Sequence, residues 1–217
     1  MRLLARAAVA VVSSAFALAS ISSAATLDLT GSVGSGIATG SAGVVTYNAS
    51  FGAVTFVANP SGSDLTWSSG NGLGIDCPSS VSGCRIDTPN QIDAPEFLTV
   101  TFAAPTFLTS VDIGLLSTTA WGRLRIDEEG SIVGSGFSID FDSNSASNGQ
   151  LTVNVNRLVT SVRFVPDHGE WNDFTLARIR VDENSVPAPG NPIPEPSSVL
   201  LMLVGGGLVA SQVRARA

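Results

Sequence analysis

Apolar and polar residues alternate along most of the middle of this chain, from about residue 26 to residue 182. Successive side chains of a β-strand point to opposite faces, so this pattern is typical of half-buried strands. No helix-period pattern of any length interrupts it. The pattern predicts strands at 44–47, 54–57, 97–102, 108–115, 124–127, 137–141, 151–155, 159–165 and 174–181. Segment 176–181 departs from strict alternation, which is typical of an edge strand or a bulged strand.

Glycine, asparagine, aspartate and proline separate these segments at the spacing of turns. A segment of this size can bury a real core between two packed sheets. We therefore expect an all-β fold over residues 26–185, an antiparallel β-sandwich of the jelly-roll kind. A barrel is the alternative. A parallel β-helix is disfavoured because the sequence has no repeat of fixed period.

Residues 1–25 have the three parts of a secretory signal peptide. Arg2 and Arg6 give a positive start, residues 7–21 form an apolar run, and residues 22–25 are small, as a signal peptidase requires. We expect export through the secretion machinery, with cleavage after Ala24 or Ala25. An uncleaved anchor is the alternative, and serines within the apolar run disfavour it.

The C-terminal end combines a proline-rich linker, an apolar stretch and a basic terminus. The linker, residues 186–193, can be neither helix nor central strand. Residues 197–213 have about the minimum length for a transmembrane helix, and glycines within them are tolerated in lipid. Arg214 and Arg216 would stay on the cytoplasmic side, which places the preceding domain outside the inner membrane. The two ends therefore agree.

Pro194, Glu195 and Pro196, followed by the apolar stretch and the terminal arginines, resemble the PEP-CTERM sorting signal. The resemblance covers about residues 193–217. It implies that the protein is a substrate of an exosortase, a multi-pass membrane enzyme of Gram-negative bacteria that cuts near the motif. The triplet would be the recognition element, and residues 194–217 would anchor the chain in the inner membrane before it reaches the cell surface or the extracellular space. A plain C-terminal anchor is the alternative.

The resemblance also implies a role in extracellular polysaccharide, biofilm or floc formation. A second, looser similarity lies in the domain itself, in the segments GLGI (72–75), QID (91–93), EFLTVTF (96–102) and LTSVDIG (108–114). This set is similar to a module often found upstream of PEP-CTERM tails. It indicates a fold family rather than an activity.

The charge of the chain excludes one class of partner. The sequence has no lysine, and without the two ends seven arginines face up to 18 aspartates and glutamates. Because nucleic-acid binding requires clustered cations, we exclude nucleic acid as a partner. Divalent cations and neutral sugars remain compatible with such a surface, although solubility alone also explains it.

Cys77 and Cys84 enclose a short segment rich in serine, with a proline and a glycine. In an exported chain this spacing indicates a local disulfide bond. A metal site is the alternative, disfavoured because no second pair of cysteines or histidines is present.

Catalytic motifs are absent from the sequence, and we predict no catalytic residue and no enzyme. His168 is the single histidine, so a two-histidine metal site is impossible, and it lies in a segment typical of a turn. A glycosidase needs two carboxylates at a defined separation across a cleft, which sequence spacing does not establish. The tryptophans Trp67, Trp121 and Trp171 are more readily interpreted as packing residues than as sugar platforms.

The best candidate for chemistry is a calcium site in one loop. Asp87, Asn90, Asp93 and Glu96 precede a predicted strand, and Asp76 is near. Carboxylate and amide oxygens from a loop are the ligands that Ca²⁺ prefers. Solvated turn residues are the alternative. A second acidic run, residues 140–144, begins like an EF-hand loop but lacks its glycine and closing glutamate.

Three functions stay open. The first is a non-enzymatic matrix or adhesion protein that contacts extracellular polysaccharide, the second a secreted hydrolase of that polysaccharide, and the third a structural surface protein without a specific ligand. The sorting tail, the β-rich domain and the missing catalytic motifs favour the first.

Overall fold

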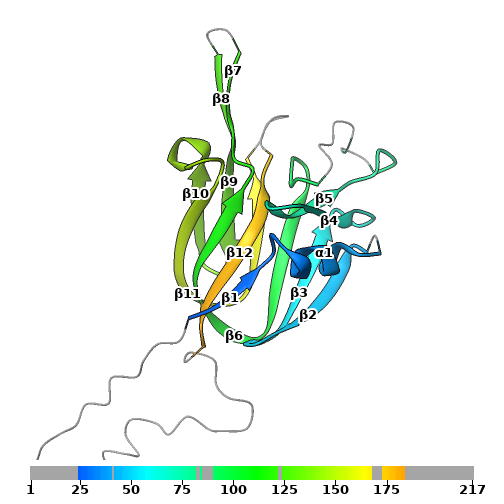
Figure 1. Ribbon diagram of the computed structural model, residues 1–217, viewed down its shortest axis with the longest axis vertical. Coiled ribbons are helices and arrows are strands. Elements are labelled where there is room, and N and C mark those ends of the chain that lie inside the picture. The colour runs from blue at the N-terminus through cyan, green and yellow to red at the C-terminus, as the bar shows by residue number, and fades with distance from the viewer. Residues whose placement is uncertain are drawn as a thin grey trace, which may run out of the picture.

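The computed structural model describes residues 24–40, 42–81, 84, 90–121, 124–167 and 173–183, and of residues 118–121 and 124–126 the backbone alone. Most of these residues form antiparallel strands (Figure 1). The elements are β1 (Ala24–Asp28), α1 (Ser32–Ala38), β2 (Val44–Ala49), β3 (Gly52–Asn59), β4 (Asp64–Ser68), β5 (Gly72–Asp76), β6 (Phe97–Gly114), β7 (Thr118–Trp121), β8 (Leu124–Asp127), β9 (Glu129–Gly134), β10 (Phe137–Asp142), the 3-10 turn η1 (Ser143–Ser145), β11 (Leu151–Pro166) and β12 (Thr175–Asp182). The prediction of an all-β, antiparallel fold is confirmed.

Two long strands, β6 and β11, organise the sheet. Residues 98–101 of β6 pair with residues 161–164 of β11, and residues 106–113 of β6 pair with residues 151–159 of β11. The register shifts between Asn154 and Arg157 and again between Val159 and Ser161. The early half of β6 also pairs with β3, whereas its late half pairs with β12. Each long strand therefore belongs to two different sets of neighbours.

We call these sets the first and the second arm. The first arm has the order β10–β9–β11–β6–β3–β2, through residues 161–166 of β11 and 97–102 of β6. The second arm has the order β11–β6–β12, with β1 and β5 pairing β12, and β4 pairing β5. Figure 1 shows the sheet turning at the lower end of the view, near the label of β6.

A single hydrophobic core takes side chains from both arms. Val54, Phe56, Val100, Ile132 and Phe164 come from the first arm. Val111, Ile113, Ile179 and Val181 come from the second arm. In each strand the residues between these core positions face away from the core, as the alternation in the sequence predicts.

The long strands correct the predicted boundaries. Segments 97–102 and 108–115 are one strand, as are 151–155 and 159–165, because the polar and proline residues between them lie at bends and bulges rather than at turns. Strand β12 contains the expected bulges, with shifts between Leu176 and Arg178 and between Arg180 and Val181. It is not an edge strand, since β6 lies on one side and β1 and β5 on the other.

One short helix lies in a part of the chain where the sequence shows no helix-period pattern. Helix α1 has seven residues, and Ile37 and Gly34 are its buried positions. A Cβ on Gly34 would lie 1.9 Å from the carbonyl oxygen of Leu29, so glycine permits this close packing. A helix of about two turns offers too few positions to show a 3.6-residue period.

The first and the last described strands are neighbours. Ala24 pairs with Asp182 and Asp28 with Arg178. Strand β1 begins two residues before the predicted domain start at residue 26, and Ala25 is part of the core. Both ends of the described domain therefore lie at the same place on the fold.

Candidate functional site

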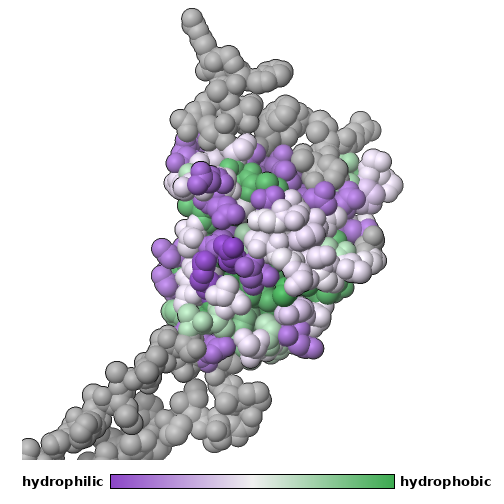
Figure 2. Space-filling model, in the orientation of Figure 1, coloured by the Kyte–Doolittle hydropathy of each residue, from purple (hydrophilic) through white to green (hydrophobic). Residues whose placement is uncertain are grey.

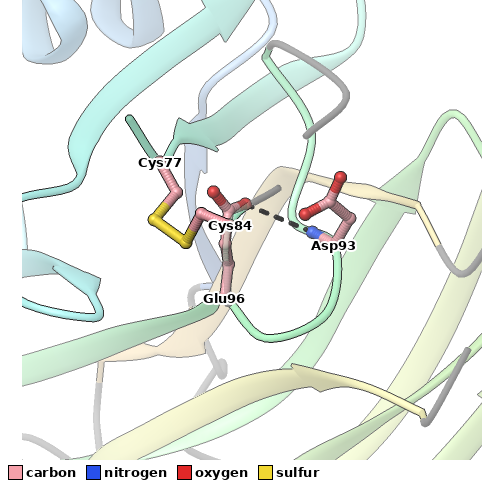
Figure 3. The surroundings of a disulfide bond; sticks show 4 residues. All are labelled: Cys77, Cys84, Asp93 and Glu96. Carbon is pink, nitrogen blue, oxygen red and sulfur yellow. Dashed lines mark hydrogen bonds between the residues drawn. A yellow bond between two sulfur atoms is a disulfide. The ribbon is translucent and has the colours of Figure 1, made fainter. Parts of the chain in front are cut away.

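The disulfide prediction is confirmed. Cys77 and Cys84 are bonded, their Cα atoms are 5.8 Å apart, and both residues are buried (Figure 3). Cys77 directly follows β5, whose inner residues Leu73 and Ile75 are fully buried. The bond therefore fixes the start of the following loop against the core.

The chain from residue 90 to residue 96 lies against β5 and the beginning of β12. Ile75 donates its backbone N–H to Gln91, and Ile92 exchanges backbone hydrogen bonds with Phe174. Asn90 adopts a φ of 71°, in the left-handed region that asparagine tolerates. These bonds hold the second half of the predicted calcium loop in one place.

Two of the predicted calcium ligands come together in this segment. Asp93 and Glu96 are 5% and 1% exposed, and the backbone N–H of Asp93 donates to Glu96 Oε2 at 3.3 Å. Figure 3 shows the Glu96 carboxylate beside the disulfide, facing the backbone nitrogen of Asp93. Asp76 is exposed at the end of β5, and Asn90 is half-buried.

Asp87, the remaining predicted ligand, lies outside the described residues. Across residues 24–183, leaving out the gaps named above, no group of three or more His, Cys, Asp or Glu side chains is arranged to hold a metal ion. The calcium site stays a prediction, and Asp93 with Glu96 is the pair on which it now depends.

The sorting residues Pro194, Glu195 and Pro196 also lie outside the described residues, as do residues 1–23 of the signal peptide, the linker and the apolar stretch of the tail. In the described part of the chain, no helix combines the length and the apolar character needed to cross a bilayer.

A charged network that sequence analysis missed covers the outer face of the second arm. Arg180 contacts both carboxylate oxygens of Asp112, at 2.6 and 2.7 Å, and Arg178 bridges Asp112 and Asp28 at 3.2 Å. Thr152 donates to Asp112 at 2.7 Å. Figure 2 shows hydrophilic side chains gathered over β12, where both arginines lie.

Asp112 is 4% exposed although it points away from the core. Burial by itself would raise its pKa, but hydrogen bonds from Arg180, Thr152 and Arg178 hold the pKa below its ordinary value. The carboxylate is therefore ionised and saturated with donors, as in a structural ion pair. It offers no free oxygen for catalysis.

A second acidic group lies where the chain passes from β8 to β9. Glu128 accepts hydrogen bonds from the backbone N–H and the hydroxyl of Ser117, the latter at 3.1 Å. Burial raises the pKa of Glu128 to about 7, and Asp173 adds to the rise. Nearby, a hollow of about 400 Å³ is lined by Glu129, Asp140, Asp142 and Asp167.

The outer face of the first arm has a different character, because hydroxyls cross it in a row. The strand register aligns Thr46, Thr55, Thr101 and Ser161 on four neighbouring strands. The hydroxyls of Thr46 and Thr55 are 2.9 Å apart, and those of Thr101 and Ser161 are 3.2 Å apart. We call these four residues the hydroxyl row.

A parallel row lies next to it. It consists of Val44, Val57, Thr99, Arg163, Val133 and Ser138. The guanidinium of Arg163 lies 5.7 Å above the ring of Phe97. Among the residues that the structure describes, no carboxylate forms an ion pair with Arg163.

A hollow of about 310 Å³ opens between the two rows. Its lining includes Thr99, Ser161, Arg163, Val133 and Ser135. A second hollow, of about 270 Å³, adjoins it and shares Ser135, Thr160 and Ser161. Together they form a shallow groove at the turn that joins β9 and β10.

The signal for this face was present in the sequence. Thr99 and Thr101 are the polar residues of the alternating segment 97–102, and Thr55 is the polar residue of segment 54–57. Alternation shows that these side chains share a face within a strand, but not which strand lies beside which. Strand order is what brings the hydroxyls together.

No protein-family model matches this sequence, and no curated protein matches it significantly.

Proposed function

We propose that this protein is an exported, exosortase-sorted protein of the bacterial cell surface or extracellular matrix, non-enzymatic and associated with extracellular polysaccharide. The observation that carries the proposal is the order of the C-terminal elements: Pro194, Glu195 and Pro196, an apolar stretch, and terminal arginines. An N-terminal signal peptide precedes the domain in the same chain.

Two features of the domain support this proposal. The Cys77–Cys84 disulfide suits an oxidising compartment outside the cytoplasm. The pairing of β1 with β12 brings both ends of the domain together, so signal and tail would attach at one place and leave both outer faces accessible. We also propose that the folded sheet is a jelly-roll-like β-sandwich, its two arms corresponding to the two layers.

The test follows the fate of the tail. The full chain is expressed in a strain with an exosortase and in the same strain without it, and the intact mass of the recovered protein is measured. We expect loss of the terminal arginines in the first strain alone. Replacement of Pro194, Glu195 and Pro196 by alanine should abolish that difference.

Replacement of the linker prolines Pro187, Pro189 and Pro192 by alanine is the matched control, since it changes the same number of residues just before the sorting motif. This control should be processed like the wild type. Recovery of the wild type with its arginines intact in the strain that makes the enzyme would overturn the proposal.

One observation favours the alternative of a polysaccharide hydrolase. A carboxyl group with a pKa of about 7, Glu128, lies near a hollow lined by further carboxylates. Raised carboxyl pKa values are characteristic of general acids. Both oxygens of Glu128 are engaged by Ser117, however, which favours a structural role. Release of reducing ends from extracellular polysaccharide, abolished by Glu128→Gln, would establish the hydrolase instead.

A further inference from the structure

We propose that the outer face of the first arm binds an extended chain of a neutral polysaccharide, along the hydroxyl row and beside Arg163. The inference deepens the proposed function and depends on it only for the source of the ligand.

The hydroxyl row matches an extended ligand in its dimensions. Neighbouring strands lie about 4.8 Å apart, so the four strands from Thr46 to Ser161 span about 14 Å. The row is perpendicular to the strands, and its side chains are held by the sheet rather than by loops. A ligand of several sugar units could therefore contact successive hydroxyls without ordering the protein first.

The row keeps hydrogen-bonding capacity for a ligand. A hydroxyl has one donor and two acceptor sites, and contact with one neighbouring hydroxyl uses only part of them. Ser161 donates to the carbonyl of Val100, at 3.2 Å, so Thr101 and Ser161 present mainly acceptors outward. Arg163 supplies donors beside them, because stacking on Phe97 leaves its N–H groups available. Sugar hydroxyls satisfy both kinds of partner.

Apolar groups accompany the polar ones. Val44 is 60% exposed, and it shares the adjacent row with Val57 and Val133. Leu158, 62% exposed, lines the adjoining hollow. The C–H faces of sugar rings are apolar and their edges polar, so a surface that mixes apolar side chains with hydroxyls is complementary to them. A stable protein interface would instead need a contiguous apolar centre with aromatic anchors.

Charge selects a neutral ligand. The hydroxyl row, the row that contains Arg163, and the positions next to it (Asp140, Ser131 and Val165 on three strands, Phe97 and Asn59 on two others) contain one cation and one anion. The chain as a whole has a formal charge of −7. A polyanion would be repelled by the molecule. The carboxylates of the hollow near β9 and β10, Glu129, Asp142 and Asp167, lie beyond these positions, at the end of the face away from the hydroxyl row.

The experiment measures binding of the exported, processed protein to immobilised cellulose, β-1,3-glucan and mannan, with alginate as the polyanionic comparison. We expect retention on at least one neutral polymer and none on alginate. The double substitution Thr55→Val and Thr101→Val removes two hydroxyls while keeping side-chain shape, and should weaken binding about tenfold or more. Arg163→Gln should weaken it as well.

Asn154→Ala is the control, because Asn154 is exposed on β11 where this strand pairs with Ser110 in the second arm. It should bind like the wild type. Binding that survives all substitutions on the first arm would overturn this site and leave the proposed function standing. Retention on alginate alone, or on none of the polymers while the tail is processed normally, would overturn the inference. Dimerisation that the double substitution abolishes would show that a second copy occupies this face.

Discussion

At the scale of single residues, Asp112 is the position on the outer face of the sheet that depends most on its hydrogen-bond partners. Its carboxylate is almost fully covered, and Arg178, Arg180 and Thr152 are its hydrogen-bond donors. Asp112→Ala removes all of these hydrogen bonds at once, and those to the two guanidinium groups are the stronger ones, although Arg178 keeps its contact with Asp28. Asp112→Ala should therefore lower the free energy of unfolding by about 2–4 kcal/mol, measured by urea denaturation at neutral pH.

Asp140→Ala provides the comparison, since Asp140 is exposed and accepts one hydrogen bond, from Ser131. Its effect should stay within about 0.5 kcal/mol. The pKa of Asp112 is lowered in the folded state, so its contribution is present above the unfolded-state pKa and is lost as pH falls through the folded one. An Asp112→Ala effect no larger than that of Asp140→Ala would show that the network is not stabilising.

For Glu128 we expect a pH dependence of stability opposite to that of Asp112. Its pKa rises to about 7 in the folded protein, mainly through burial, so folding favours the protonated form. The associated stability is complete below the unfolded-state pKa and is lost as pH rises through about 7. Relative to Glu128→Gln, the wild type should lose thermal stability between about pH 4.5 and pH 7. A difference in Tm that is the same at pH 4 and pH 8 would contradict this assignment.

At the scale of elements, alternation in the sequence predicted several strands correctly. Segments 44–47, 54–57, 124–127 and 137–141 each lie within an observed strand. The missed strands are β1, β4, β5, β7 and β9, each of four to six residues. In β5 residues of both faces are buried, so alternation is absent. Strand β4 alternates, but over five residues only. Strand β9 begins with Glu-Gly-Ser and gives an equally weak signal. Burial on both faces and small residues conceal a strand from a period-2 criterion.

The features of the candidate site likewise separate into local ones, which the sequence predicted, and long-range ones, which it did not. Cysteine spacing and compartment predicted the disulfide, because both arguments are local. Asp93 and Glu96 come together because they are only three positions apart within one tight turn. The contacts of Asp112 with Arg178 and Arg180 span more than sixty residues, and they depend on the pairing of β6 with β12. Strand order is not encoded in a local pattern, so this network was not predictable.

Gly74 shows how one element positions the candidate loop. A Cβ on Gly74 would lie 2.1 Å from the carbonyl oxygen of Asn90, so any larger residue forces the loop away from β5. Gly74→Ala should destabilise the protein by about 1–3 kcal/mol. It should also increase hydrogen exchange at the amide of Ile75, which donates to Gln91.

Gly36→Ala is the control for this substitution. No heavy atom lies within 4 Å of a Cβ at Gly36, and the residue is in helix α1, where alanine is preferred to glycine. We expect unchanged or slightly higher stability. Equal effects of the two substitutions would mean that the contact between β5 and the loop does not constrain the fold.

At the scale of the whole molecule, continuity of β6 and β11 makes the two arms one cooperative unit. Because β6 and β11 belong to both arms, unfolding of one arm would also disrupt strands of the other, and the core is one cluster. Ile132 in the first arm and Ile179 in the second are both buried in it. Ile132→Val and Ile179→Val should each lower the unfolding free energy by about 0.5–1.5 kcal/mol, with one transition and an unchanged denaturant slope. Far- and near-ultraviolet circular dichroism should report the same midpoint for each variant; separate midpoints would show that the arms unfold independently.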